Sequence, residues 1–387
     1  MRTYLDYNAT TPLRPEAKAA MIEAIDSCGN PSSVHREGRV ARQCVETARG
    51  RVAKLVHTNS DNVIFTSGGT EANALALRGT LQAAATAGQR ISRLIVSEIE
   101  HDSILANAAT CEDTFPGLRL TVCPVTENGQ VNVAEFRRLL REGKGRALVS
   151  MMLVNNETGV VQPISELATL AREAGAMIHC DAVQAAGRLS IEMTKLGVDC
   201  LTLSSHKIGG PQGIGALIAA PSVPLASQIS GGRQEVGRRA GTENVSAIAG
   251  FGAAAIAAGG AHLQSKSLAD MRMTLERRLM EACPEAVVFG NNAERVANTI
   301  CVAAPMVSAE TMVIALDLDG FAVSAGAACS SGKVSKSHVL KAMHVDDSLA
   351  SCAIRLSFGW QTKDEELAAF ADAWASVVKR ARSRAAA

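Results

Sequence analysis

The sequence lacks a net charge, a long apolar run and any paired-cysteine motif. Its 387 residues include 39 Lys and Arg against 38 Asp and Glu, so electrostatics gives no reason to expect nucleic acid or an anionic membrane as a main partner. No stretch approaches the ~18 apolar residues that a membrane span needs, and no apolar run follows the first basic residue. We therefore expect a cytoplasmic protein that acts on small neutral or zwitterionic molecules, with neither a nucleic acid nor a membrane as partner.

Ten cysteines are present, but no two of them are spaced C-x-x-C, which argues against zinc ribbons and thioredoxin-type sites. Nine lie in patterns typical of strands or helices, where we expect burial to keep them inert. The tenth, Cys329, lies in the small-residue run Ser-Ala-Gly-Ala-Ala-Cys-Ser-Ser-Gly-Lys, which predicts a mobile loop. Nearby Lys333, Lys336 and His338 favour a reactive thiolate, although an incidental thiol in a flexible linker is the alternative.

The length exceeds that of a usual single hydrophobic core, so we expect two domains. Strand-length apolar runs alternate with helix-period segments through the first two-thirds of the chain. This α/β pattern predicts a large domain over 16–254, built on a mostly parallel, helix-covered sheet with ligands at the carboxyl ends of its strands. The pattern then changes, and we predict a smaller α+β domain formed by 1–15 and 255–387.

One lysine stands at the end of a predicted strand, among groups that can hold a phosphate. It is Lys207, in the run Ser-Ser-His-Lys-Ile-Gly-Gly-Pro that begins at Ser204. A lysine that forms a Schiff base needs such a fixed position with hydroxyl and imidazole donors beside it. Alone, this motif is more often a solvated lysine in a turn, so its weight comes from the motifs that accompany it.

A second predicted strand ends in His179-Cys-Asp181-Ala-Val-Gln184, which places a carboxylate among apolar residues. A buried Asp opposite a pyridine nitrogen keeps that nitrogen protonated and makes the ring an electron sink, and Asp181 is the candidate for this role. Gln184 would then hydrogen-bond the phenolic oxygen of the same cofactor. Half of a metal site is the alternative for His179 and Asp181, but no third ligand lies at suitable spacing, so we expect no metal.

The segment Thr66-Ser-Gly-Gly-Thr70-Glu-Ala-Asn73 joins a predicted strand to a helix. We expect Thr70 to be the N-cap of that helix and the exposed N–H groups at the helix start to bind the cofactor phosphate. A simple capped turn, without a ligand, is the alternative for this segment taken alone.

Two single side chains complete the candidate site. His101 follows a strand at the same predicted sheet edge, which favours a residue that stacks on the cofactor ring and moves protons; a helix-start histidine without a catalytic role is the alternative. Arg355 interrupts the apolar strand Ala-Ile-Arg-Leu-Ser-Phe with the side chain best suited to grip a carboxylate. A structural ion pair is the alternative for Arg355.

Together these residues closely resemble the NifS/IscS-type cysteine desulfurases, which are class V aminotransferase-like, fold-type I pyridoxal-phosphate enzymes. The resemblance runs from Tyr4-Leu-Asp-Tyr-Asn-Ala-Thr-Thr-Pro to Arg355-Leu-Ser-Phe-Gly. It implies a large domain with a mostly parallel seven-stranded sheet and a smaller α+β domain that carries the Cys329 loop. It also implies that Lys207 is the Schiff-base lysine, with Asp181, Gln184 and His101 as the pyridinium, phenolate and stacking partners.

The same resemblance implies the remaining contacts. Gly69, Thr70, Ser204 and His206 match phosphate-binding positions, and Thr242 matches a phosphate contact that is donated across a homodimer interface. Asn156 and Arg355 match the site for the substrate carboxylate, and Asn156 is also expected to contact the cofactor. Cys329 matches the persulfide-forming nucleophile, preceded here by Gly-Ala-Ala where the family commonly has Gly-Ser-Ala.

The implied activity is the conversion of L-cysteine to L-alanine, with the sulfur carried as a persulfide on Cys329. The sulfur would pass to an acceptor such as an iron–sulfur scaffold protein, for cluster assembly or other sulfur delivery. A selenocysteine lyase or another class V pyridoxal-phosphate enzyme is the first alternative, but it would not need a mobile nucleophilic cysteine. A non-catalytic sulfur-pathway partner is the second, and the intact Lys207, Asp181, His101 and Cys329 argue against it.

Replacement of Cys329 by serine tests which thiol carries the sulfur. We expect the Cys329→Ser variant to bind cofactor and L-cysteine but to form neither persulfide nor alanine, because a hydroxyl is too poor a nucleophile towards sulfur. Peptide mass mapping after a single turnover should find one extra sulfur atom on the Cys329 peptide of the parent protein. Extra sulfur on a different cysteine, or full alanine production by the variant, would overturn this assignment.

Overall fold

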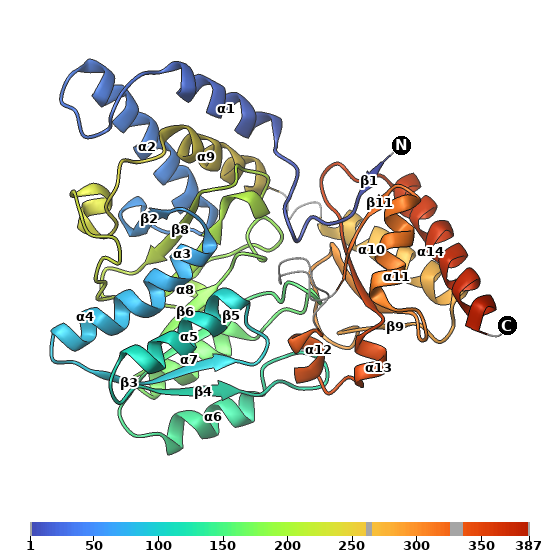
Figure 1. Ribbon diagram of the computed structural model, residues 1–387. Helices are drawn as coiled ribbons and strands as arrows, with labels where there is room; N and C mark the ends of the chain where they lie inside the picture. Colours follow the sequence, from blue (N-terminus) through green and yellow to red (C-terminus); the bar gives the residue numbers. More distant parts are fainter. Residues whose placement is uncertain (1, 261–264, 326–335, 386–387) are drawn as a thin grey trace.

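The computed structural model describes residues 2–260, 265–325 and 336–385, which form two lobes around separate sheets (Figure 1). The larger lobe contains a seven-stranded sheet, and the smaller lobe contains a four-stranded sheet and a two-stranded sheet. Both ends of the chain lie in the smaller lobe, so the chain starts there, crosses to build the larger lobe and returns (Figure 1).

The seven-stranded sheet has the order β2-β8-β7-β6-β5-β3-β4. Its strands are β2 (Val63–Thr66), β3 (Ile91–Ser97), β4 (Arg119–Cys123), β5 (Arg146–Met152), β6 (Met177–Asp181), β7 (Cys200–Ser204) and β8 (Gly215–Ala219). All neighbours are parallel except where β8 pairs antiparallel with β7 and with β2. Since β2 thereby runs in the same direction as β7, the prediction of a mostly parallel seven-stranded sheet is confirmed.

Both faces of this sheet are covered, as alternate side chains of one strand show. On β3, Leu94 and Val96 join a cluster with Leu77, Leu81 and other apolar residues on one face. Ile95, which points to the other face, joins the largest apolar cluster of the protein. Parallel sheets need this double cover because neither face can be left to water.

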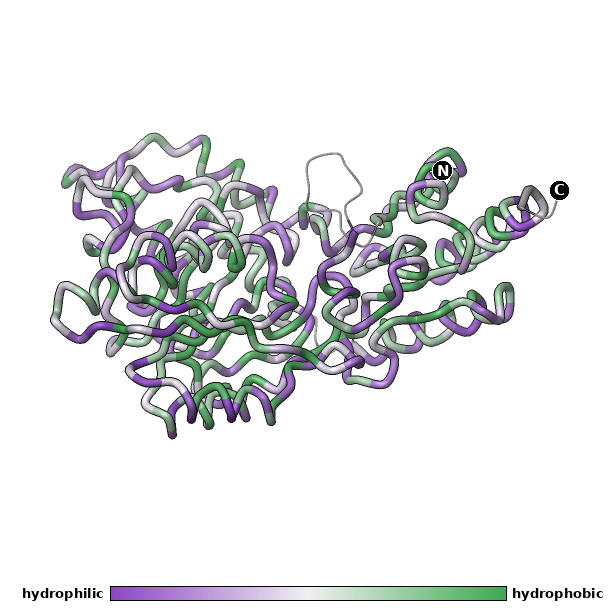
Figure 2. The backbone as a smooth tube through the Cα atoms, turned by 60° about the horizontal axis from the view of Figure 1, so that its bottom comes forward, coloured by the Kyte–Doolittle hydropathy of each residue, from purple (hydrophilic) through white to green (hydrophobic). Residues whose placement is uncertain are grey.

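The helices of the larger lobe lie around the sheet (Figure 1), and hydrophilic and hydrophobic residues alternate along much of the chain (Figure 2). These helices are α1 (Pro15–Asp26), α2 (Arg36–Leu55), α3 (Gly69–Ala74), α4 (Thr80–Thr86), α5 (Asp102–Thr114), α6 (Val133–Glu142), α7 (Ile164–Glu173), α8 (Met193–Leu196) and α9 (Val245–Gly259). Short helical turns are η1 (Ser60–Asn62), the π-helical η2 (Leu75–Gly79), η3 (Ser205–Lys207) and η4 (Gln234–Gly237).

Helix α9 consists largely of alanine and glycine because it packs closely against α1 and α2. A Cβ atom at Gly252 would lie 2.7 Å from the Cβ of Ala48 on α2, so only glycine allows this approach. The predicted domain boundary at residue 255 falls inside α9, and Ala255 and Ala258 pack in the core of the larger lobe. The exact division into domains stays a prediction.

The smaller lobe has an antiparallel sheet of order β12-β13-β10-β9 and a separate apolar core. Its elements are α10 (Ser265–Ala282), β9 (Val287–Val288), β10 (Thr299–Ala303), α11 (Ala309–Leu318), β11 (Phe321–Ala322), β12 (Ser324–Ala325), α12 (His338–Ala342), α13 (Asp347–Ala350), β13 (Ala353–Ser357) and α14 (Asp364–Ala385). The first strand, β1 (Thr3–Tyr4), pairs in parallel with β11. Among the helices in the described ranges, none has the length and apolar character to cross a membrane.

A buried ion pair holds the segment before α9 onto the larger lobe. The guanidinium of Arg49 on α2 donates two hydrogen bonds to the carboxylate of Glu235, at 2.7 and 2.9 Å. The same carboxylate accepts from the backbone N–H of Phe65 at 3.0 Å. Glu235 has a φ of 48°, in the left-handed region that non-glycine residues rarely adopt. Three charge-assisted contacts therefore hold a strained turn in place.

We expect Arg49→Met to destabilise the fold by about 3–5 kcal/mol, because it leaves the buried carboxylate of Glu235 without its partner. The control is Arg277→Met, which removes an exposed guanidinium from an i,i+4 pair with Glu281 and should leave stability unchanged. Urea unfolding of both variants measures the difference. Equal midpoints for the two variants would contradict the structural role of the Arg49–Glu235 pair.

Candidate active site

Five strands of the larger sheet end at one edge, and the residues that follow them line a single cavity. The strands are β2, β3, β5, β6 and β7, which share one direction. The cavity has a volume of about 250 Å³. Nine of the predicted site residues line it: Gly69, Thr70, His101, Asn156, Asp181, Gln184, Ser204, His206 and Lys207. The parallel topology thus gathers side chains that are up to 138 positions apart, from Gly69 to Lys207.

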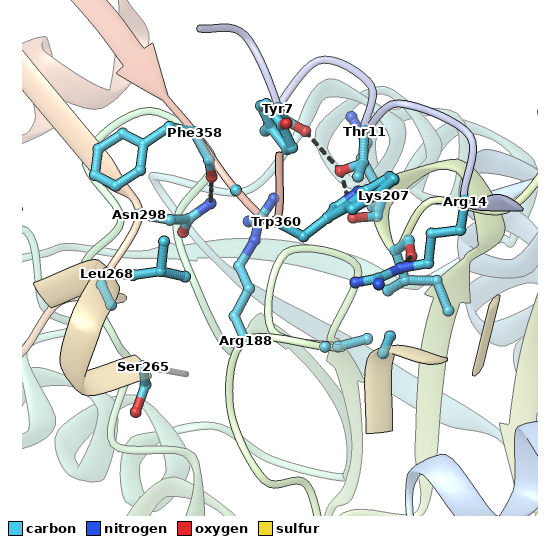
Figure 3. A pocket seen from close by; sticks show the side chains of 16 residues that line it. Tyr7, Thr11, Arg14, Arg188, Lys207, Ser265, Leu268, Asn298, Phe358 and Trp360 are labelled. Atoms are coloured by element: carbon cyan, nitrogen blue, oxygen red, sulfur yellow. Dashed lines mark hydrogen bonds between the residues drawn. The ribbon is translucent and has the colours of Figure 1, made fainter. Parts of the chain in front are cut away.

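Lys207 is held by the N-terminal segment. Its Nζ donates to the backbone carbonyl oxygens of Asn8 at 2.6 Å and Ala9 at 2.9 Å. The hydroxyl of Thr11 donates to the carbonyl of Lys207 at 2.8 Å, a contact visible in Figure 3. Lys207 also lines a second, smaller cavity of about 60 Å³, so its side chain lies between two hollows. The amine is therefore held by two backbone carbonyls at the wall of the cavity.

Asp181 ends β6 and is buried, with 6% of its surface exposed. Its carboxylate accepts hydrogen bonds from the side-chain amide of Asn73 at 2.8 Å and from the backbone N–H of Val183 at 3.0 Å. Asn73 also donates to the hydroxyl of Ser103 at 2.9 Å. Asn73 and Ser103 line the cavity but were not predicted as site residues. Asn73 could have been identified, because it lies one helical turn after Gly69 in the predicted phosphate-binding segment.

His101 is the N-cap of α5, and its Nδ1 accepts from the backbone N–H of Ser103 at 3.1 Å. A backbone N–H can only donate, so the ring proton of neutral His101 must lie on Nε2. Burial lowers the pKa of His101, while the charge of Asp181 opposes the shift. His101 thus starts a helix and also lines the cavity, and its role beside the cofactor stays a prediction.

The predicted phosphate site combines the start of the helix that follows β2 with the end of β7. Gly69, Thr70, Ser204 and His206 all line the cavity there. Burial, with Lys207 as a second cause, lowers the pKa of His206 to about 4, so its imidazole is neutral at pH 7. The expectation that Thr70 is the N-cap is wrong: α3 begins at Gly69, one residue earlier, because the extended Gly68 forms its cap without any side-chain bond.

Two predicted residues lie outside the cavity lining. Arg355 is buried and donates to the carboxylate of Asp6 at 2.8 Å and to the backbone carbonyl of Asn156 at 3.1 Å, so the ion pair that its alternative predicted is present. Thr242 is exposed on the surface of this chain. Its predicted contact with a second subunit stays a prediction. Cys329 lies outside the described residues.

The expectation that the other nine cysteines are buried is wrong for one of them, and a second is only partly buried. Cys28 is exposed because it follows the end of α1, and Cys44 is half-buried. The remaining seven are buried, and burial raises the pKa of Cys111 to about 11 and of Cys123 to about 12. An alkylating agent would reach the exposed thiol of Cys28, so mass mapping of the transferred sulfur is the more selective experiment.

Comparisons with known proteins agree on one family. The family described as Aminotransferase class-V matches residues 3–370. A cysteine desulfurase from Cereibacter sphaeroides is 42% identical over 368 residues, covering 94% of this chain and 92% of the relative. A NifS-like protein from Rickettsia africae superposes with a TM-score of 0.87 at 33% identity, covering 98% of this chain and all of that one. A structure of SspA in complex with cysteine superposes with a TM-score of 0.80 at 28% identity, covering 93% of this chain and 99% of that one.

This chain therefore belongs to the class V aminotransferase family and groups, within it, with the cysteine desulfurases. Enzymes of this family use pyridoxal phosphate as cofactor. The expected fold-type I architecture is confirmed. No group of three or more metal-ligating side chains is found within the described part of the chain.

The cavity fits pyridoxal phosphate in its chemistry. Among the described residues that line it, Asp181 alone carries a carboxylate, which can accept a hydrogen bond from a pyridinium N–H. Ser204 and Thr70 supply hydroxyl groups, and a Cβ atom at Gly69 would lie 3.1 Å from a methyl carbon of Val183, so this position leaves little room for a larger residue. Lys207 supplies the amine that binds an aldehyde. Each functional group of the cofactor thus finds a partner of the right kind.

A buried carboxyl group lies directly behind the cavity. Glu100 is fully buried, and its Oε1 accepts from the hydroxyl of Ser97 at 2.5 Å and from the backbone N–H of Met152 at 2.9 Å. Burial, reinforced by the nearby charge of Asp181, raises the pKa of Glu100 to about 8. Glu100 therefore stays protonated at neutral pH and adds no negative charge behind the cavity.

We expect Glu100 to make the fold less stable as the pH rises. Its pKa is higher in the folded state than the usual 4.5, so its stabilising effect is complete below pH 4.5 and is lost as the pH passes through about 8. Glu100→Gln imitates the protonated acid and should flatten the fall of the melting temperature between pH 5 and pH 8. Identical pH profiles for parent and variant would show that Glu100 is ionised in the folded protein.

Proposed function

We propose that this protein is a cysteine desulfurase that converts L-cysteine to L-alanine and carries the released sulfur as a persulfide on Cys329. The observation that supports this most is the meeting of Lys207, Asp181 and His101 in one cavity at the carboxyl edge of the sheet. An amine, a buried carboxylate and a neutral imidazole are the groups that proton removal next to an amino group requires. The complex of the related SspA with cysteine favours L-cysteine as the substrate.

Specific residues would hold the cofactor. Lys207 would bind its aldehyde carbon, and Asp181 would accept a hydrogen bond from its ring nitrogen. Gly69, Thr70, Ser204 and His206 would hold the phosphate, with Thr242 of a second copy completing that site in a homodimer. Gln184 would donate to the phenolic oxygen, and His101 would pack on the ring. When bound, the ring takes up the electron pair that deprotonation leaves on the substrate carbon.

Arg355 and Asn156 would bind the carboxylate of the substrate. In the ligand-free protein the guanidinium of Arg355 pairs with Asp6, and its Nε is buried without a partner among the described residues. A substrate carboxylate can satisfy this nitrogen, which is costly to leave unpaired. The bonds to Asp6 and to the carbonyl of Asn156, which lines the cavity, hold the guanidinium in place, so little side-chain freedom would be lost on binding.

The freed amine of Lys207 would take the proton from the Cα atom of L-cysteine. The thiolate of Cys329 would attack the substrate sulfur, so that a sulfur–sulfur bond forms as the carbon–sulfur bond breaks. The electron pair of the broken bond stays with the substrate and is taken up by a proton at Cβ, and Lys207 would return a proton to Cα, which gives L-alanine. The persulfide would then pass its outer sulfur to an acceptor such as an iron–sulfur scaffold protein, for cluster assembly or other sulfur delivery.

Incubation of the cofactor-loaded protein with L-cysteine and a reductant, followed by assays of sulfide and alanine, tests the activity itself. The Asp181→Asn variant tests the mechanism. We expect hydrogen exchange at the Cα atom of bound substrate to slow by at least about a hundredfold, because a neutral amide cannot keep the ring nitrogen protonated.

The matched control is Asp199→Asn, at the opposite end of the strands, where the carboxylate accepts from the backbone N–H of Ile178 at 2.8 Å. This variant should exchange at the parental rate, since an amide oxygen can accept the same bond. Undiminished exchange in Asp181→Asn would refute the role of Asp181, and absence of alanine from the parent would refute the desulfurase activity.

A further inference from the structure

Gln184 is held by partners on two sides. Nη1 of Arg188 donates to the Oε1 atom of Gln184 and, at 2.9 Å, to its backbone carbonyl. On the other side, Nε2 of Gln184 donates to the carbonyl of Asn8 at 3.0 Å. The chain makes two consecutive turns after β6, and these turns place Arg188 next to Gln184, which lies four positions earlier in the sequence. The side chain of Gln184 is thus clamped between a cation and a backbone carbonyl.

These partners allow only one orientation of the amide. A guanidinium can only donate hydrogen bonds, so the atom that faces Arg188 must be the amide oxygen. A backbone carbonyl can only accept, so the atom that faces Asn8 must be the amide nitrogen. A turned amide would put donor against donor and acceptor against acceptor at a residue that is only 6% exposed. The oxygen of Gln184 is therefore engaged away from the cavity, and only an N–H remains to act on a ligand.

We infer that Arg188 is a positioning residue that fixes Gln184 as a hydrogen-bond donor towards the phenolic oxygen of the cofactor. This inference rests on the proposed function, in which Gln184 contacts that oxygen. Arg188 acts through Gln184, since it lies on the wall of the second cavity and does not line the one that would hold the cofactor (Figure 3). Burial lowers the pKa of Arg188 to about 9, so the guanidinium still carries its charge at neutral pH.

A donor at the phenolic oxygen has a measurable electrostatic consequence. It draws negative charge from that oxygen, which then attracts the neighbouring proton on the Lys207 nitrogen less strongly. The pH midpoint at which the Lys207-bound cofactor loses this proton, seen as a change of visible absorbance, is thereby lowered. Loss of the donor should raise the midpoint by about half to one pH unit, the size expected for one hydrogen bond.

The experiment is a double-mutant cycle on the cofactor-loaded protein without substrate. We expect Arg188→Met and Gln184→Ala each to raise the absorbance midpoint, and the double variant to match Gln184→Ala alone, because Arg188 has no effect without Gln184. Arg188→Lys keeps a cationic donor and should restore most of the parental midpoint. If Arg188→Met unfolds, Arg188→Gln takes its place in the same cycle.

Two outcomes would overturn the inference. The first is an unchanged midpoint in Arg188→Met. The second is additive shifts in the double variant, which would show that the charge of Arg188 acts directly on Lys207. The midpoint is read without L-cysteine, so it does not depend on the desulfurase activity. A parent protein that titrates normally but makes no alanine would refute that activity. The test would still decide the role of Arg188.

Discussion

The site depends on one backbone carbonyl, that of Asn8. It accepts hydrogen bonds from Lys207 at 2.6 Å and from Gln184 at 3.0 Å, and the residue itself is buried. The side-chain amide of Asn8 donates to the backbone of Asn156 and to Thr299, each at 3.1 Å. Asn8 therefore links the strand ends of the larger lobe to β10 of the smaller one.

Charge at the site is controlled by burial. Glu100 and Asp181 lie close enough for their charges to interact, and burial raises the pKa of Glu100 so that it remains neutral at pH 7. His101 and His206 are also neutral, because burial lowers the pKa of each. Asp181 thus has neutral imidazoles and a neutral carboxyl group around it, an arrangement that would favour a protonated ring nitrogen beside it.

The residues that carry chemistry could be predicted because they follow apolar strands, and parallel strands bring their carboxyl ends to one edge. This logic found His101, Asp181 and Lys207, which share no local sequence neighbourhood. Asn73, Asn8 and Arg188 were missed as site residues, since their importance comes from contacts that only the folded chain creates. The ion pair joins Arg355 to Asp6, 349 positions away. The sequence alone could therefore not decide between a structural ion pair and substrate binding for Arg355.

In the proposed function, the strand-end cavity holds pyridoxal phosphate with Lys207 as its covalent partner. Reduction of the cofactor-loaded protein with borohydride, followed by digestion and peptide mass mapping, tests this directly because reduction makes the link permanent. We expect the mass of the reduced cofactor on the peptide that contains Lys207, and no labelled lysine in the Lys207→Ala variant. Cofactor mass on any other lysine of the parent protein would contradict the account.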